Sequence, residues 1–379
     1  MVKKTISLAL SLIIFFCCDF KVYSVDLSVS AQSAVLMCVN TGEVLFFKNK
    51  NKRLSMASTT KIMTSLLALE AGTPQREIVV TDKMVAVEGT SMGLIAGDSV
   101  SLIELVYGMM LQSGNDAANT VAYVLGETPE KFAFMMNKRA KEIGMNNTNF
   151  VTASGLDDKN HYSTAYDMAL LAAECIKNPE FKKISSQKTA RLSYGNPPYS
   201  RTLTNHNRLL WRYPDTIGIK TGFTKKSGRC LVSAAERNGI TLVAVTLNAG
   251  DDWNDHISMF EYGFSKCIPV KIGVDLSPYS LKVVGGTKNQ IPLKLSRDCI
   301  HLSDKQCYCT LVLKPFEYAP VSDGKTVGYA LFISDGKVID EIPVITNGTS
   351  AAKEHTVQSK DINENFLTSL IQKLLSILK

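Results

Sequence analysis

The sequence lacks the residue clusters that mark several large classes of protein. Its lysines and arginines are scattered, and a formal net charge of +7 over 379 residues is modest, so there is no footprint of nucleic-acid binding. It has no series of long apolar runs, which excludes a polytopic membrane protein. A hydrophobic content of 45% excludes a disordered chain, and the length predicts two domains with packed cores.

Cysteine and histidine are too scattered for a disulfide scaffold or a zinc site. Seven of the nine cysteines lie beyond residue 24, and this odd number is spread from residue 38 to residue 309. Cys307 and Cys309 lie near Cys299, but a spacing of two residues with only His301 nearby is poor zinc-ligand spacing. We expect one local disulfide or free buried thiols instead.

Residues 1–24 have the pattern of a secretory signal peptide. Two lysines precede an apolar stretch at 6–18, and Val22 and Ser24 are small enough for cleavage after Ser24. A retained membrane anchor is the alternative, but the apolar stretch is short for a span. We therefore expect an exported protein that works at the outer face of the cytoplasmic membrane or in the cell wall.

The first candidate catalytic pair is Ser58 and Lys61, at the start of an apolar, helix-like run that ends before Gly72. A serine hydroxyl needs a nearby base to act as a nucleophile. A spacing of three residues puts both side chains on one helix face, where a neutral lysine can take the proton. Burial or a nearby cation must lower the lysine pKa for this role. The Ser-x-x-Lys pattern recurs five times elsewhere, so it is weak by itself.

Two later motifs offer partners for this serine. Ser113-Gly-Asn115 interrupts two predicted helices within 101–126, where buried polar groups need hydrogen-bond partners. Helix capping is the simpler explanation for such residues. Lys220-Thr221-Gly222 lies on the first strand of a predicted β-meander over 217–247 and supplies a cation, a hydroxyl and an open backbone. An ordinary strand lysine is the alternative there.

The remaining patterns complete a two-domain layout. They predict a β-hairpin at 34–47, helices at 129–143 and 165–177, and a small all-β module after Pro269. A polar linker follows, and then a short stretch with apolar residues at helical spacing. That helix is too short to span a bilayer but can lie in its interface; docking on the β module is the alternative.

In this order the three motifs resemble those of the active-serine penicillin-recognising enzymes. Within them the chain looks like a low-molecular-mass penicillin-binding protein, a serine-type D-alanyl-D-alanine carboxypeptidase. The resemblance implies an α+β fold: a helical cluster on an antiparallel sheet, β-lactamase/transpeptidase-like, then a small all-β sandwich domain and a C-terminal amphipathic helix. The expected domains are a signal peptide at 1–24, a serine peptidase domain at 25–266, a β-sandwich at 267–345, a linker at 346–364 and a membrane-anchor helix at 365–379.

The resemblance also assigns roles to residues. Ser58 is the nucleophile, Lys61 its general base and Ser113 a proton relay, with no metal or cofactor. The implied substrate-binding residues are Asn115, Lys220, Thr221, Gly222 and Phe223, and the N–H groups of Ser58 and Phe223 form the oxyanion hole. The implied partners are a peptidoglycan stem peptide ending in D-Ala-D-Ala, β-lactam antibiotics as covalent inhibitors, and a membrane surface through 365–379.

Alternatives remain open at this point. A D,D-endopeptidase or a serine β-lactamase of the same fold shares the three motifs, but the loop at 144–164 has no glutamate of the kind that class A β-lactamases use. An inactive cell-wall-binding homologue is the non-enzyme alternative. His206 stands where some relatives have an arginine for the substrate carboxylate, and Arg208 follows two residues later.

Overall fold

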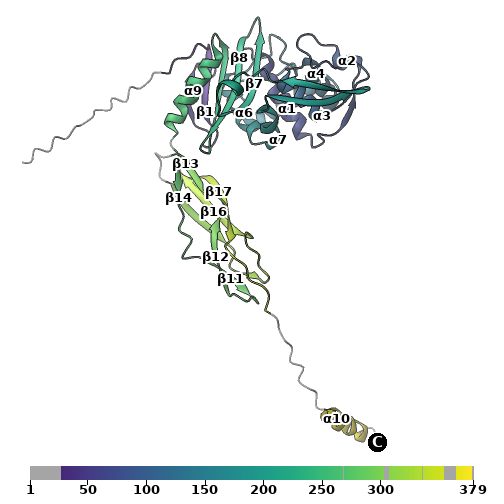
Figure 1. The fold of residues 1–379 in the computed structure, drawn as a ribbon, viewed down its shortest axis with the longest axis vertical. Coiled ribbons are helices and arrows are strands. Elements are labelled where there is room, and N and C mark those ends of the chain that lie inside the picture. Colours follow the sequence, from purple (N-terminus) through teal and green to yellow (C-terminus); the bar gives the residue numbers. More distant parts are fainter. Residues whose placement is uncertain (1–26, 268, 303–306, 335, 354–363, 378–379) are drawn as a thin grey trace, which may run out of the picture.

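The computed structural model describes residues 27–267, 269–302, 307–334, 336–353 and 364–377. The expected signal peptide at 1–24 lies outside the described residues, as do residues 354–363 of the expected linker. Figure 1 shows a first unit built of a sheet and helices, followed by an all-β domain. The expected fold class is therefore confirmed.

A five-stranded antiparallel sheet runs through the first unit in the order β2-β1-β9-β8-β7. The strands are β1 (Ser33–Cys38), β2 (Val44–Lys48), β7 (Thr216–Thr224), β8 (Gly228–Arg237) and β9 (Ile240–Ala249). The pairing Val35↔Val245 joins the N-terminal hairpin to the last strand of the meander. Helices cover both faces of this sheet (Figure 1), so β1 is buried along its whole length and shows no polar–apolar alternation.

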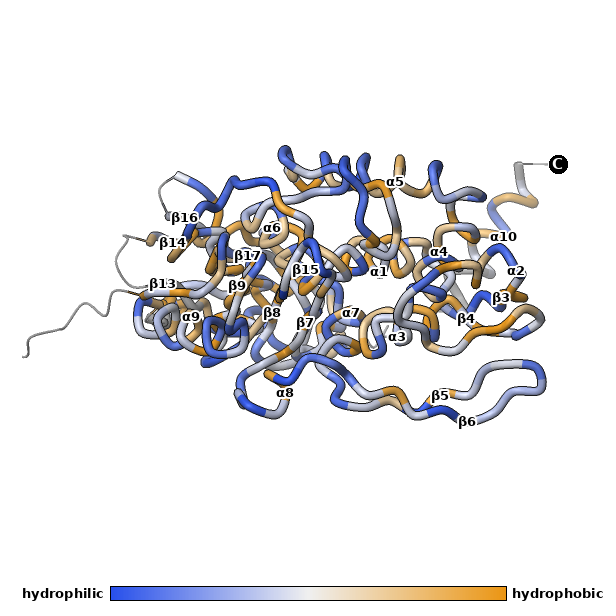
Figure 2. The backbone as a smooth tube through the Cα atoms, turned by 90° about the horizontal axis from the view of Figure 1, so that it is seen from above, coloured by the Kyte–Doolittle hydropathy of each residue, from blue (hydrophilic) through white to orange (hydrophobic). Residues whose placement is uncertain are grey.

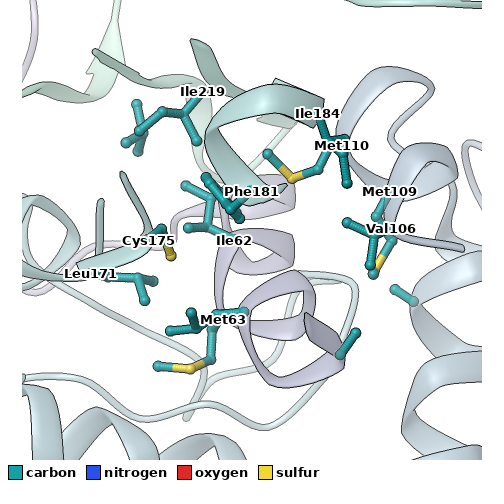
Figure 3. Close-up of a cluster of buried hydrophobic side chains, with 14 of the residues drawn as sticks. Ile62, Met63, Val106, Met109, Met110, Leu171, Cys175, Phe181, Ile184 and Ile219 are labelled. Carbon is teal, nitrogen blue, oxygen red and sulfur yellow. The ribbon is translucent and has the colours of Figure 1, made fainter. Parts of the chain in front are cut away.

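Most helices pack on one face of the sheet around α1. They are η1 (Ala57–Thr60), α1 (Lys61–Glu70), α3 (Leu102–Leu111), α4 (Asn115–Gly126), α5 (Pro129–Ile143), α6 (Ala165–Ile176) and α7 (Pro179–Ser185). Figure 2 shows α1 between α6 and α4, with α3 and α7 also in contact with it. In Figure 3 side chains of these helices surround Ile62 and Met63 of α1. The residues just before and within α1 are therefore held by apolar packing on several sides.

The opposite face is covered by α9 (Asp252–Lys266), a helix that was not among those predicted from the sequence. Met259 and Phe260 pack there against the sheet. The carboxylate of Asp255 accepts hydrogen bonds from the N–H of Ser30 at 2.9 Å and from its hydroxyl at 2.7 Å. The apolar residues at 253, 257, 260 and 264 have helical spacing, so this helix was detectable from the sequence.

Several smaller elements were also absent from the sequence predictions. They are α2 (Asp82–Val85), α8 (Leu209–Arg212), and the paired strands β3 (Glu77–Val79) with β4 (Ser99–Ser101) and β5 (Thr189–Gly195) with β6 (Pro198–Thr204). Figure 2 shows the β5–β6 hairpin along the edge of the first unit, and both of its strands contact α3. Short two-stranded pieces such as these depend on contacts with the rest of the molecule.

The predicted helix boundaries agree closely with the structure. Gly72, with a φ of +72°, follows the end of α1 in the left-handed conformation that glycine adopts most easily. The side chain of Thr164 caps α6 by accepting a hydrogen bond from the N–H of Asp167 at 3.0 Å. Between α3 and α4 the chain turns at Ser113, whose φ is +61°. The interruption predicted at Ser113-Gly-Asn115 is confirmed.

The all-β domain has a six-stranded sheet in the order β14-β16-β17-β12-β11-β15 and a two-stranded sheet β10-β13. Its strands are β10 (Pro269–Ile272), β11 (Ser280–Val284), β12 (Gln290–Leu295), β13 (Cys299–Leu302), β14 (Cys307–Leu313), β15 (Glu317–Tyr318), β16 (Thr326–Ser334) and β17 (Lys337–Thr346). Phe332 and Cys299 belong to one buried cluster that both sheets share. Short apolar runs of the sequence at 281–284, 291–295, 309–313, 329–333 and 338–344 coincide with β11, β12, β14, β16 and β17.

The C-terminal end of this domain extends beyond residue 345. Ser350 exchanges backbone hydrogen bonds with Val321, and Ala352 forms a bridge with Gly286. We therefore propose that the linker begins after residue 353. Beyond it lies helix α10 (Glu364–Ile377), which Figure 1 shows apart from the β domain. Over the described part of the chain, no helix combines the length and apolarity needed to cross a membrane.

Candidate active site

Ser58 lies in the single turn η1 that leads directly into α1. The preceding residue, Ala57, has a φ of +48°, which is unusual for a residue with a side chain. Its carbonyl group is packed against Gly155, where a Cβ atom would come within 1.9 Å of the Ala57 oxygen. The serine therefore stands on a sharp turn that a tightly apposed loop supports.

Lys61 is the first residue of α1 and is fully buried. Its Nζ atom lies 2.9 Å from Ser58 Oγ, 2.7 Å from Asn115 Oδ1 and 2.6 Å from the carbonyl oxygen of Ser154. Burial, and next the charge of Lys220, hold the pKa of Lys61 well below its ordinary value, against a smaller opposing effect of Asp116. A neutral amine here can donate to the two carbonyl oxygens and turn its lone pair toward the serine.

Ser113 and Asn115 come from the break between α3 and α4. Asn115 accepts a hydrogen bond from Lys61 and donates one from Nδ2 to the carbonyl oxygen of Glu88 at 2.6 Å. Within the described part of the chain, the Ser113 hydroxyl has no hydrogen-bond partner, although its residue is only 6% exposed. It lines the same cleft as Ser58. The hydroxyl is therefore free to bond a ligand.

Lys220 lies in β7 and is almost completely buried. Burial lowers its pKa to about 7, and its Nζ donates a hydrogen bond to the carbonyl oxygen of Thr221 at 2.8 Å. Next along the strand, Gly222 lies against η1: a Cβ atom there would be 3.0 Å from the nitrogen of Ser58. Only a glycine lets β7 approach the serine so closely.

One cleft of about 530 Å³ opens onto these groups. Its lining comes from η1, the α3–α4 break, β7, the starts of β8 and α9, and two loops. The residues are Ser58, Thr90, Ser113, His206, Arg208, Thr221, Gly222, Phe223, Arg229, Asp252 and Trp253. The structure thus brings together five of the eight residues predicted for the site at the cleft surface. The other three, Lys61, Asn115 and Lys220, are buried nearby.

The lining of the cleft also includes basic side chains. Arg229 forms an ion pair with Asp252 and lies over the ring of Trp253 at 5.7 Å. Arg208 is exposed and has no ion pair or side-chain hydrogen bond with any described residue. Burial and the nearby charge of Lys220 lower the pKa of His206. Arg208 is therefore the cation of this group that can receive an anionic ligand.

Sequence reasoning missed the two loops that support the site. The carboxylate of Asp116 accepts hydrogen bonds from the N–H groups of Met92, Gly93 and Leu94 at 2.9 to 3.1 Å, and so holds the loop that carries Glu88 and Thr90. Ser154 contributes through its backbone carbonyl alone. A backbone group leaves no signature in the sequence, whereas a buried aspartate next to Asn115 was a signal that could have been used.

His161 supports the second of these loops. Its Nδ1 accepts a hydrogen bond from the N–H of Val151 at 2.9 Å, so Nε2 carries the proton and donates to Thr60 Oγ1 at 2.8 Å. Burial lowers its pKa to about 4, which keeps the ring neutral. These bonds give His161 a structural role in support of η1 and the loop at 151–152.

The described residues contain no group of three or more histidine, cysteine or acidic side chains arranged to hold a metal. The cleft presents the hydroxyls of Ser58 and Ser113, and two lysines are buried beside it. The sequence pattern of the D-alanyl-D-alanine carboxypeptidase family matches residues 21–251, more than half of the chain. The chain belongs to this family. It is a serine-type carboxypeptidase by its family and by the three motifs that meet in the cleft.

Individual members of the family resemble the chain over most of its length. D-alanyl-D-alanine carboxypeptidase DacF of Bacillus subtilis is 33% identical over 87% of this chain and 86% of its own length. The Escherichia coli enzyme DacC is also 33% identical, with 84% of each chain covered. Penicillin binding protein 5 from Haemophilus influenzae has a solved structure with a TM-score of 0.61 at 28% identity, over 86% of this chain and 98% of that one. These matches include the β domain.

Proposed function

We propose that this carboxypeptidase removes the terminal D-alanine from peptidoglycan stem peptides that end in D-Ala-D-Ala, through an acyl-enzyme on Ser58. The single observation that carries the proposal is the 2.9 Å contact between Lys61 Nζ and Ser58 Oγ in a buried setting. A lysine held neutral by burial can take the serine proton as the hydroxyl attacks the penultimate peptide bond.

The oxyanion of the tetrahedral intermediate would be bound by the backbone N–H groups of Ser58 and Phe223. The close approach of Gly222 to the Ser58 nitrogen supports this role, because it brings the neighbouring N–H of β7 toward the same point. Backbone donors fixed in advance stabilise charge that develops only in the transition state.

Ser113 would pass the proton to the departing D-alanine, and water would then release the acyl-enzyme. The unpaired hydroxyl of Ser113 beside Ser58 supports the relay. Asn115 Nδ2 has a second hydrogen that does not reach Glu88, and it would hold the substrate amide carbonyl. No metal or cofactor takes part in these steps.

The substrate carboxylate would be bound by Lys220 and Thr221, with Arg208 as a further cation in the lining of the cleft. The buried lysine supplies a charge that is weakly screened, and the threonine hydroxyl lines the cleft. The ion pair of Arg229 with Asp252 leaves Arg208 as the additional cation.

Covalent labelling tests this assignment. The full chain incubated with a fluorescent penicillin should acquire one label, and Ser58→Ala should abolish it. Ser322→Ala is the matched control, because Ser322 also belongs to a Ser-x-x-Lys pattern but is exposed in the β domain. A label that persists in Ser58→Ala would refute the nucleophile.

Turnover distinguishes the remaining alternatives. Release of free D-alanine from a purified pentapeptide ending in D-Ala-D-Ala is expected of a carboxypeptidase, and its absence together with labelling would favour an inactive cell-wall binder. Rapid loss of the penicillin label would indicate a β-lactamase. Asp157, an acidic residue of the 144–164 loop, accepts hydrogen bonds from the hydroxyls of Ser55 and Thr224 and does not line the cleft.

We also propose that the protein is exported and that α10 binds a membrane surface. Leu370, Ile371, Leu374 and Leu375 of α10 are each at least 48% exposed, and their spacing places them on one side of the helix. Such a face can lie among lipid headgroups without crossing the bilayer.

A sedimentation assay tests this membrane proposal. The full chain should sediment with anionic lipid vesicles, and replacement of Leu370 and Leu374 by serine should abolish binding. Replacement of Gln372 and Ser376 on the other side by alanine should not. Equal sedimentation of the two double variants would contradict the proposal.

A further inference from the structure

The hairpin of β5 and β6 carries an arginine that is held between two aromatic rings. The guanidinium carbon of Arg201 lies 4.1 Å from the centre of the Tyr194 ring and 4.0 Å from that of Tyr199. The Arg201 side chain is only 11% exposed, and its Nη2 atom lies 3.8 Å from the buried carboxylate of Asp98. A cation that is stacked on aromatic faces and paired with a carboxylate has little freedom to move.

From this position Arg201 holds the loop that passes beside the hairpin. Its Nη1 atom donates hydrogen bonds to the carbonyl oxygens of Gly93 at 2.8 Å and of Met92 at 3.4 Å. The hydroxyl of Tyr194 donates to the same Met92 oxygen at 2.8 Å. The hairpin therefore binds carbonyl groups of the loop, while the carboxylate of Asp116 binds N–H groups of the same residues.

The same loop fixes Asn115. The carbonyl oxygen of Thr90 accepts a hydrogen bond from the backbone N–H of Asn115 at 2.6 Å, and that of Glu88 accepts one from its Nδ2 at 2.6 Å. Asn115 Oδ1 in turn lies 2.7 Å from the amine of Lys61. Short hydrogen bonds and the backbone of the loop thus connect Arg201 to Lys61.

We propose that Arg201 is a positioning residue for acyl transfer: by holding the loop at 92–93, it keeps Asn115 in place beside the amine of Lys61. Arg201 does not line the cleft, so it acts through the loop and not on the substrate. This role rests on the proposed functions of Ser58 and Lys61. A general base must be held in reach of its proton, and a shift of about 1 Å caused by a distant substitution can cost on the order of 10²-fold in rate.

A positioning role and a purely structural role predict different results. If Arg201 only stabilised the hairpin, its loss would lower the Tm and leave the rate and pH profile of the folded protein unchanged. If it positions Asn115, loosening the loop lets water reach the amine of Lys61, whose pKa is lowered chiefly by burial. The pKa of Lys61 should then rise toward its ordinary value. Its charged neighbours Lys220 and Asp116 are not altered by the substitution.

Acylation by a fluorescent penicillin measures this effect in the full chain. Arg201→Met keeps a long side chain but removes the charge and the N–H donors, and it should slow acylation about tenfold. The rise of the acylation rate with pH should move to higher pH, because the pKa of Lys61 has increased. Arg191→Met is the matched control, since Arg191 of β5 is exposed and donates to Ser200 Oγ at 2.6 Å instead of to the loop. It should leave the rate and the pH profile unchanged.

Hydrogen exchange follows the loop independently of catalysis. The N–H groups of residues 92–94, which bond the carboxylate of Asp116, should exchange about tenfold faster in Arg201→Met than in the unaltered chain or in Arg191→Met. Faster exchange with an unchanged acylation rate would show that Arg201 only supports the loop, and this would overturn the proposal. Slower acylation with unchanged exchange would overturn it as well, because the effect would not pass through the loop.

Arg201→Lys provides the test if Arg201→Met does not fold. Its ammonium group keeps a charge between the two rings but lacks the planar fork that reaches the loop and Asp98 together. Acylation should slow by about threefold, and exchange at 92–94 should become faster. Equal rates, pH profiles and exchange in Arg201→Lys and the unaltered chain would overturn the proposal.

A failed positioning role and a failed nucleophile give different results. An unaltered chain that is not labelled, or that is still labelled after Ser58→Ala, would contradict the nucleophile. Equal labelling rates in the unaltered chain and Arg201→Met, with labelling lost in Ser58→Ala, would overturn the positioning role alone.

Discussion

The buried part of the site and its exposed lining are built differently. In the buried part, the amine of Lys61 has three oxygen neighbours within 2.9 Å. In the exposed lining, Arg208 has neither an ion pair nor a side-chain hydrogen bond within the described part of the chain. Protein contacts hold the buried part in place, whereas Arg208 is left to be paired by a ligand.

This difference separates chemistry from recognition. A buried amine has its pKa set by the fold, and donors held in place need no reorganisation during the reaction. An exposed arginine contributes a charge that water screens, so its effect on binding is small. Substitution of the buried residues should therefore change the rate of reaction, and substitution of the exposed Arg208 should change the affinity for substrate.

The largest effect is expected for Lys61→Ala. Loss of a general base lowers rates by about 10²- to 10⁴-fold, so we expect acylation by a fluorescent penicillin to slow by about 10³-fold. Lys337→Ala, in another Ser-x-x-Lys pattern but exposed, should label normally. Circular dichroism would establish that both variants are folded. Labelling of folded Lys61→Ala within tenfold of the normal rate would show that the base lies elsewhere.

Gly222→Ala should have the next largest effect. The new Cβ atom would lie 3.0 Å from the Met56 carbonyl oxygen and from the nitrogens of Ser58 and Thr59, so β7 or η1 must shift. Displacement of an oxyanion donor should lower kcat for D-alanine release by about 10- to 100-fold. Gly273→Ala, where the added atom meets nothing within 4 Å, is the control. Equal kcat values for the two variants would contradict the proposed oxyanion hole.

The pH profile tests the two buried lysines together. Lys61 must be neutral to act as a base, so kcat/KM should rise with pH through its lowered pKa. Lys220 must be charged to bind a carboxylate, so kcat/KM should fall about tenfold per pH unit above its pKa of about 7. The two apparent values belong to the coupled pair.

Lys220→Arg separates the two limbs of this profile. Its guanidinium stays charged, so the decline at high pH should disappear while the rise at low pH remains. In Lys220→Ala the pKa of Lys61 should increase, because a neighbouring cation has been removed. The low-pH limb should then move to higher pH. A profile that is identical in all three proteins would rule out the lysine pair as the titrating groups.

The smallest effect is expected for Arg208→Ala. Loss of one exposed charge should raise KM for a D-Ala-D-Ala peptide about fivefold and leave kcat within about twofold. Arg212→Ala removes a nearby exposed arginine that does not line the cleft, and it should leave both constants unchanged. A drop in kcat for Arg208→Ala without a change in KM would mean that Arg208 takes part in the chemical step.

Much of this organisation was visible in the sequence. Three short polar motifs, each next to an apolar run, predicted the meeting of Ser58, Ser113 and Lys220, and the helix at 129–143 was predicted to the residue. The helical spacing of apolar residues and the position of glycines at helix ends and turns are local properties. A short stretch of sequence is therefore enough to predict a helix. The strands of the β domain could be predicted from the sequence for the same reason.

Other parts depended on contacts between distant segments. The carbonyl of Ser154 reaches Lys61 only because a loop more than ninety positions away folds back onto η1. Arg229 and Asp252 form their ion pair where the start of β8 meets the start of α9. Neither contact has a sequence pattern of its own. A backbone carbonyl is the same in every residue, and a single charged residue has many possible partners.

By itself, the sequence predicted the nucleophile, its base and the helix that follows them, because Ser58-x-x-Lys61 is followed by an apolar run and stands in order with two further motifs. The tertiary structure alone decided how far the lysine pKa values fall and which of the two arginines that line the cleft has no partner among the described residues. Those properties depend on burial and on distances across the fold, and both arise only when the sheet, the helices and the loops pack together.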